Sequence, residues 1–240
     1  MKNNILHIHT LKQVDYQEVW DFQEILMQKL IQTKRNRTDD SSQFTTHHLI
    51  FCEHNPVYTL GKSGSMDHLL IPQDQMETTQ FEFHKINRGG DITYHGPGQW
   101  TIYPILDLEC YYRDVHRYVR TLEEIVINLL SYYGIEGSAV EDFTGVWVGE
   151  QHNRKTCAIG VHLSRWVSMH GLALNVNADL NHFDYIIPCG IPRGEKSVTS
   201  MSHEINRPIE MSEVKDRFIT EFVSYFPTEV ILNAPYLPKS

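Results

Sequence analysis

Long apolar runs are missing from this 240-residue sequence. No stretch approaches the roughly 20 consecutive apolar residues that a membrane-spanning helix needs. The first ten residues, MKNNILHIHT, contain only a short apolar run that His7 and His9 interrupt, and this pattern is a poor match to a signal peptide. We therefore expect a soluble cytoplasmic protein that makes no contact with a membrane.

Basic charge is also scarce. The sequence has 21 Lys and Arg residues against 30 Asp and Glu residues, which gives a formal net charge of −9. A chain that is negative overall repels phosphate backbones, so we expect no nucleic-acid partner, although a local basic patch stays possible in such a chain.

Cysteine is sparse, and the four cysteines are too widely spaced for a zinc ribbon. The 14 histidines form no pattern with carboxylates that is typical of a metal site, so we expect no metal. Cys52 and Cys157 lie in apolar segments, where a free cysteine usually packs, and Cys110 follows another such segment. Cys189 differs, because it lies between Pro188 and Gly190 in a predicted loop, and this context favours a displayed, reactive thiol.

Hydrophobic periodicity predicts helices and clustered strands. The helices are expected over 15–33, with Asp15 as a cap, over 115–133, ended by Gly134, and over 211–225. Strands are expected over 5–8, 47–54, 56–61, 80–86, 92–94, 100–108 and 167–176, with a hairpin over 145–163. Residues 34–44 are polar and lack periodicity, so we expect a flexible loop there. The pattern indicates one α+β domain that spans residues 1–240.

The segment LGKSGS (60–65) resembles a phosphate-binding loop only in part. That loop requires a glycine five residues before its Gly-Lys-Ser, and Pro56 occupies the position. We therefore interpret this segment as a solvated turn.

The segment RGGDITYHGPGQ (88–99) holds four glycines beside a predicted strand. A simple turn needs one or two, so this glycine loop indicates that a ligand lies along the main chain. His95 and His170 are each followed by glycine. Each is either a satisfied core histidine or an imidazole that orients a carbonyl or a thiol.

Five segments together resemble the lipoyl(octanoyl) transferase family. They are HNPVYTLG (54–61), RGGDITYHGPGQWTIY (88–103), GVWVGEQHNRKTCAIG (145–160), HGLALNV (170–176) and PCGI (188–191). The similarity runs from about residue 15 to residue 225. It implies a fold like the catalytic domains of biotin and lipoate protein ligases, which is a mixed β-sheet with flanking helices.

The resemblance also implies a reaction. Members of this family move an octanoyl group from octanoyl-acyl carrier protein to a lysine of a lipoyl domain, without a cofactor. The acceptors implied are the lipoyl domains of 2-oxoacid dehydrogenase complexes and the glycine cleavage H protein. Cys189 would carry the acyl group as a thioester, and Lys155 would be its partner. His170 is a further candidate. The acyl group would contact three blocks of main chain, namely Arg88, Gly89, Gly90, Asp91, Ile92, Thr93, Tyr94 and His95; Ala158, Ile159 and Gly160; and Gly171, Leu172 and Ala173.

Three alternatives remain at this stage. A lipoate or biotin ligase of the same fold would use ATP and would not need Cys189, and neither would a non-catalytic acyl-binding module. A Cys-His hydrolase would pair Cys189 with His95 or His170. A separate hypothesis concerns RDVHRYVR (113–120), where helical spacing places Arg113, His116, Arg117 and Arg120 on one face. This face either is simply solvated or docks the acyl carrier protein.

Overall fold

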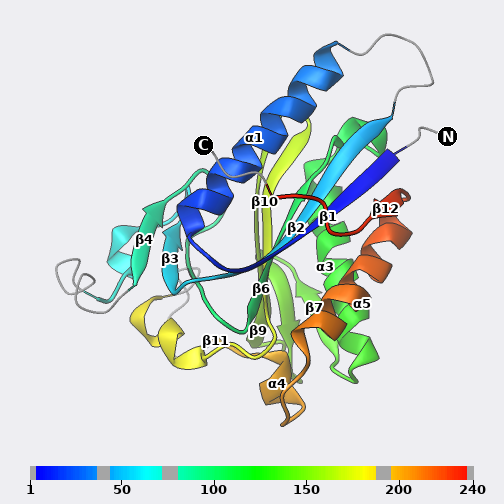
Figure 1. Cartoon of the computed structure of the whole chain (residues 1–240). Helices are drawn as coiled ribbons and strands as arrows, with labels where there is room; N and C mark the ends of the chain where they lie inside the picture. The colour runs from blue at the N-terminus through cyan, green and yellow to red at the C-terminus, as the bar shows by residue number, and fades with distance from the viewer. Residues whose placement is uncertain (1–3, 37–43, 72–80, 188–195, 237–240) are drawn as a thin grey trace.

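The computed structural model describes residues 4–36, 44–71, 81–187 and 196–236. Two sheets and the helices around them form the architecture (Figure 1). The α-helices are α1 (Tyr16–Arg35), α3 (Val115–Tyr132), α4 (Met201–Glu204) and α5 (Met211–Tyr225). Short 3-10 helices are η1 (Met66–His68), η2 (Leu108–Cys110) and η3 (Leu180–Tyr185). Cys189 and part of the 34–44 loop, residues 37–43, lie outside the described residues.

Among the described residues, the larger sheet has the strand order β12-β1-β2-β6-β10-β9-β8-β7, and β11 pairs with β9. Its strands are β1 (Asn4–Val14), β2 (Thr45–His54), β6 (Gln99–Ile105), β7 (Gly137–Val140), β8 (Phe143–Val148), β9 (Arg154–Ser164), β10 (Val167–Asn175), β11 (Ser197–Val198) and β12 (Glu229–Ile231). β1 runs parallel to β2 and to β12, whereas β2, β6, β10, β9 and β8 pair antiparallel in turn. The predicted mixed sheet is thereby confirmed.

The smaller sheet positions the glycine loop. Its order is β4-β3-β5, formed by β4 (Glu82–Lys85), β3 (Val57–Leu60) and β5 (Ile92–His95). An apolar cluster that includes Tyr58, Tyr94 and Phe183 packs this sheet against η3. The chain between β4 and β5 is therefore held at both ends, beside the larger sheet.

Helices cover both faces of the larger sheet (Figure 1). α1 begins where predicted, because the Asp15 carboxylate accepts a hydrogen bond of 3.1 Å from the Glu18 amide and caps the first turn. Its apolar stripe, which includes Phe22 and Leu26, packs with residues of β2, β6 and β10. α3 and α5 pack on the opposite face with Leu172 and Leu174. The sheet is therefore the middle layer of three.

The predicted elements agree with the structure in type, and the exceptions are short. The strand predicted over 100–108 ends at Ile105, because Asp107 caps the 3-10 turn that starts at Leu108. Sequence periodicity did not predict β7, β11 or β12, which are too short for an alternating pattern to be visible. Within the described residues, no helix is long and apolar enough to cross a membrane.

The segment 60–65 is a turn, as expected, but it is not simply solvated. The amides of Gly61, Lys62 and Ser63 donate to the carbonyl oxygens of Asp91, Arg88 and Gly90, at 3.0–3.3 Å. This turn therefore supports the glycine loop, and the interpretation as a solvated turn holds only for its exposed side chains.

Candidate active site

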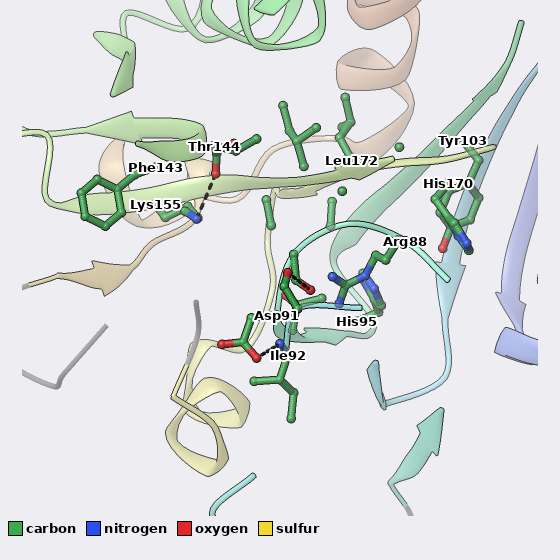
Figure 2. Close-up of a pocket in the computed structure, with 18 of the residues that line it drawn as sticks. Arg88, Asp91, Ile92, His95, Tyr103, Phe143, Thr144, Lys155, His170 and Leu172 are labelled. Carbon is green, nitrogen blue, oxygen red and sulfur yellow. Dashed lines mark hydrogen bonds between the residues drawn. The ribbon is translucent and has the colours of Figure 1, made fainter. Parts of the chain in front are cut away.

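A pocket of about 430 Å³ lies between the larger sheet and the glycine loop, within the usual size range for small-ligand pockets (Figure 2). Its floor is made by small residues that face one another on neighbouring strands. Gly160 of β9 pairs with Gly171 of β10, and Ala158 pairs with Ala173. Residues of alternate position, such as Leu172, face the opposite layer and pack there with α3 and α5. The small side chains therefore leave free space on the glycine-loop side of the sheet.

The glycine loop approaches the floor closely. The Gly89 amide donates a 3.0 Å hydrogen bond to the Val161 carbonyl oxygen of β9. A Cβ atom at Gly160 would lie 2.7 Å from the Gly89 carbonyl oxygen, which is closer than real Cβ contacts. Gly90 has a φ of +86°, in the left-handed region that favours glycine. The glycines therefore allow the main chain of the loop to lie directly against strand β9, beside the pocket.

Arg88 fixes the loop from inside. Its guanidinium is buried and donates to the carbonyl oxygen of Thr59 at 2.8 Å, to the Thr59 hydroxyl at 2.9 Å and to the Gly89 carbonyl oxygen at 3.0 Å. Figure 2 shows the Arg88 side chain next to His95, on the glycine-loop side of the sheet. Arg88 therefore links β3 to the glycine loop at the pocket lining.

His95 is held by protein groups at both ring nitrogens. Nδ1 lies 2.8 Å from the Gln99 Oε1 atom, and Nε2 lies 3.3 Å from the Thr59 hydroxyl. The Gln99 amide nitrogen in turn donates to Asn175 Oδ1 at 2.8 Å. Burial is the largest cause that holds the pKa of His95 well below its usual value, followed by the nearby His54. His95 is therefore a neutral ring that positions β5.

His170 is the second histidine that the sequence singled out, and it also lines the pocket. Its φ of +57° is unusual for a residue other than glycine. Its amide donates to Gln23 Oε1 at 2.9 Å, and its Nε2 atom donates to Asn87 Oδ1 at 2.7 Å. Burial, and then the Arg88 cation, lower the pKa of His170 to about 3. His170 is thus fixed between α1 and the pocket.

Lys155 lies near the opposite end of the pocket from His170 (Figure 2). The residue is 7% exposed, and its Nζ atom donates a 3.1 Å hydrogen bond to the Thr144 carbonyl oxygen. The same ammonium lies 4.6 Å from the centre of the Trp147 ring. A second lysine, Lys196, lies 4.2 Å from that ring. Lys155 is thus a buried cation at the pocket wall, placed by β9 and β8.

The structure brings most of the predicted site residues together at one pocket. The lining includes the predicted residues Arg88, Gly90, Asp91, Ile92, Thr93, His95, Lys155, Ala158, Ile159, Gly160, His170, Gly171, Leu172 and Ala173. Gly89 and Tyr94 are not part of this lining.

The Tyr94 side chain does not line this pocket. Tyr94 packs in the apolar cluster of the smaller sheet, and its hydroxyl lies 2.6 Å from His182 Nδ1. Alternation along β5 explains the difference, since Tyr94 faces away from its neighbours Thr93 and His95. Gly89 likewise contributes its amide to β9 and does not face the pocket.

Sequence reasoning missed several lining residues, because only the fold brings them to the pocket. These residues are Tyr16, Ser63, His68, Tyr103, Asp142, Phe143 and Thr144. Tyr16 is the first residue of α1, and His68 ends η1. No signal in the local sequence marks either as a pocket residue.

The structure describes Cys52, Cys110 and Cys157, and the two that lie in apolar strands, Cys52 and Cys157, are packed as expected. Cys52 and Cys157 are fully buried. Burial raises the pKa of the Cys52 thiol to about 12 and raises that of Cys157 as well. Cys110 is half-buried. Among the described residues, no group of three or more His, Cys, Asp or Glu side chains is placed to hold a metal ion.

Buried neutral histidines make stability depend on pH. Burial lowers the pKa of His54 to about 4, and its Nε2 atom accepts a 2.8 Å hydrogen bond from the Tyr103 hydroxyl while Nδ1 donates to the Val14 carbonyl oxygen. Below the unfolded pKa of about 6.5, the unfolded chain binds more protons, so stability falls as pH falls from about 6.5 towards about 4. The free energy of unfolding should fall by up to about 1.4 kcal/mol per pH unit for each such histidine.

Urea titrations at about pH 7 and about pH 5 measure this loss. The His54→Gln variant should lose less stability between the two pH values than the wild type. Exposed His152, whose ring makes a hydrogen bond with Ser138, provides the matched control, because His152→Gln should keep the wild-type pH dependence. A wild-type protein that is equally stable at both pH values would contradict this account.

Comparison with known proteins gives one consistent result. The family model of the lipoyl protein ligase A/B catalytic domain matches residues 15–223. An octanoyltransferase of Flavobacterium johnsoniae is 48% identical over 233 residues, covering 95% of this chain and 100% of that protein. An octanoyltransferase of Christiangramia forsetii is 47% identical, with 95% and 98% covered. Among solved structures, lipoate-protein ligase A bound with ATP superposes with a TM-score of 0.69 at 15% identity, covering 98% of this chain and 90% of that one. This last similarity confirms the predicted fold.

Proposed function

Because this chain belongs to the lipoyl protein ligase A/B catalytic domain family, we propose that it carries an octanoyl group as a thioester on Cys189, from octanoyl-acyl carrier protein to a lysine of a lipoyl domain. The enzyme is an octanoyltransferase of lipoate biosynthesis. The proposed acceptors are the lipoyl domains of 2-oxoacid dehydrogenase complexes and the glycine cleavage H protein. The cytoplasmic location stays a prediction.

The observation that carries the proposal is the pocket with Lys155 at its wall. Cys189 itself lies outside the described residues, so its position is part of the proposal. Two described neighbours support it. The Ile187 amide donates to the carbonyl oxygen of His68, a lining residue, and Val198 pairs with Lys155. Ile187 precedes Cys189 by two residues in the sequence.

The first step forms the acyl-enzyme. A free thiol with a pKa of about 8.5 is only slightly ionised at neutral pH, and the Lys155 ammonium would stabilise the Cys189 thiolate. The thiolate attacks the thioester carbonyl of the donor, a new C–S bond forms, and the C–S bond to the carrier protein breaks. The carrier thiolate leaves and takes a proton from Lys155. The small residues of the floor leave room for the acyl chain along the strands.

The second step passes the acyl group to the acceptor. The lysine amine attacks the Cys189 thioester, a C–N bond forms, and the C–S bond to Cys189 breaks. The amine must lose a proton in this step, and Lys155, neutral after the first step, is one base for it. The oxyanion needs hydrogen-bond donors. The side chain of His95 is not suited to this, since both of its ring nitrogens already have protein partners.

The basic segment 113–120 gains no support as a docking surface. Arg113 pairs with Glu109 at 2.8 Å, Arg120 pairs with Glu123 at 2.6 Å, and Arg117 lies over the Tyr112 ring. The helix that carries most of these residues, α3, packs on the face of the sheet opposite the pocket. These contacts favour the alternative of a solvated face.

A substrate comparison tests the proposed function against an ATP-dependent ligase. The enzyme should transfer octanoyl to a lipoyl domain from octanoyl-acyl carrier protein without ATP, because a thioester is already activated. It should not use free octanoate with ATP. Octanoylation of the lipoyl domain is read as a mass increase. Transfer only from octanoate with ATP would overturn the proposal, and so would binding of the acyl group with no transfer.

A further inference from the structure

One peptide unit links the pocket wall to the helix layer behind the sheet. Lys155 Nζ donates a 3.1 Å hydrogen bond to the Thr144 carbonyl oxygen, which Figure 2 shows as a dashed line. The amide of the same peptide bond, that of Gly145, donates a 2.9 Å hydrogen bond to Glu123 Oε1 of α3. Because this peptide is trans and planar, its carbonyl and amide groups point in opposite directions. The direction of the Gly145 amide therefore fixes the direction of the oxygen that holds Lys155.

Glu123 is a buried carboxylate that the transfer mechanism does not otherwise use. The residue is 0% exposed. Its second oxygen, Oε2, accepts a 2.6 Å hydrogen bond from Arg120, which is exposed on α3. Because a buried charge is costly unless its partners compensate it, these two contacts hold the carboxylate in one position. An ionised carboxylate also accepts from a peptide amide more strongly than a neutral oxygen does, which suits Glu123 to orient a peptide.

A β-bulge at the same place turns Lys155 towards the pocket. The pairing of β8 with β9 shifts after Val146, so that one step along β8 matches the two steps from Cys157 to Lys155. Residues two apart on a regular strand share a face, but Cys157 packs in the apolar cluster with α3 whereas Lys155 lines the pocket. Gly145 borders the bulge with a φ of +121°, and a Cβ atom there would overlap the Cys157 carbonyl oxygen. Where the strand pair is irregular, the contact from Glu123 helps to fix its geometry.

We propose that Glu123 is a positioning residue for Lys155. Its carboxylate holds the Gly145 amide and so orients the peptide, and the Thr144 carbonyl oxygen then keeps the Lys155 ammonium at the pocket wall. This inference rests on the proposed function, and it leaves every role of Lys155 in the two steps unchanged. Lysine has a long side chain with many rotamers, so without an oriented acceptor the ammonium would spend less time at the pocket wall. Glu123 therefore acts on turnover through Lys155, without touching a substrate.

Three variants of α3 test the contact between Glu123 and the peptide. Glu123→Met removes the acceptor and keeps a buried side chain of similar length, and turnover with saturating octanoyl-acyl carrier protein and lipoyl domain should fall by about tenfold, because small displacements of a catalytic group are costly. Glu123→Gln keeps an oxygen that can accept from the Gly145 amide, so it should stay within about threefold of wild type. Glu124→Met makes the same substitution at the exposed neighbouring residue and should keep the wild-type turnover.

A second background separates positioning from a general effect on the fold. In the Lys155→Met protein, which lacks the ammonium, the further change Glu123→Met should alter the residual transfer by less than about twofold, because Glu123 would act only through Lys155. A merely structural role would instead lower turnover by the same factor in both backgrounds. Thermal melting of each variant shows that it is folded.

Equal losses from Glu123→Met in the two backgrounds would overturn the inference, and so would wild-type turnover by Glu123→Met or an equally large loss in Glu123→Gln. If Glu123→Met does not fold, Glu123→Asp takes its place in both backgrounds with the same expected pattern, because it keeps the charge and shortens the reach of the carboxylate by one carbon. A wild type that transfers no octanoyl group from octanoyl-acyl carrier protein would refute the proposed function instead.

Discussion

Transfer of octanoyl to a lipoyl domain is expected to disappear in the Cys189→Ala variant, with a loss of at least about 10³-fold. Removing a nucleophile forces direct attack of the amine on the carrier thioester, without the covalent intermediate that divides the reaction into two easier steps. The rate of transfer under saturating donor measures the effect.

The other cysteines are the controls for this experiment. Cys52→Ala and Cys157→Ala remove buried thiols whose pKa values are raised by burial, and both variants should lose stability while keeping the chemistry. Cys110→Ala should also transfer the octanoyl group. Turnover near the wild-type rate by Cys189→Ala would exclude the covalent mechanism.

Lys155 gives the second large effect. Lys155→Met keeps much of the buried stem but removes the ammonium that the Thr144 carbonyl oxygen and the Trp147 ring hold at the pocket wall. The Cys189 thiolate would lose its cation, so alkylation of Cys189 by iodoacetamide at neutral pH should slow by about tenfold or more. Transfer should fall further, by about 10²-fold or more, because the carrier thiolate would also lose its proton donor.

Two further lysine variants refine this prediction. Lys155→Arg keeps a positive charge that does not leave as a proton, so it should alkylate faster than Lys155→Met and still transfer poorly. Lys196→Met removes a second ammonium from the same Trp147 ring and is the matched control, with a much smaller expected effect on alkylation. Identical pH profiles of alkylation for wild type and Lys155→Met would show that Lys155 does not tune the thiol.

The sequence predicted the glycine loop and the strand that carries Lys155, because each of them is encoded by one short segment. The glycines around Arg88 indicate a close approach of main chain, and the structure places Gly89 against Gly160 for that purpose. The apolar segment that begins at Lys155 indicates a strand, and β9 places the lysine at the pocket wall. Such features follow from backbone geometry and from the period of the strands.

Other parts of the site depend on contacts between distant segments. His68 and Asp91 are 23 residues apart, and no periodicity relates them. Tyr16 reaches the pocket only because α1 packs across the sheet. Tyr94 differs from its neighbours for a simpler reason, since side chains alternate along β5 and that of Tyr94 packs in the cluster of the smaller sheet.

The central claim is that the octanoyl group passes through Cys189, and intact mass spectrometry tests it most directly. The enzyme is incubated with octanoyl-acyl carrier protein without an acceptor, and the modified peptide is then located. We predict a gain of one octanoyl group on Cys189, which disappears when a lipoyl domain is added and reappears on that domain. An enzyme that transfers octanoyl while its own mass stays unchanged, or that carries the group on another residue, would contradict the account.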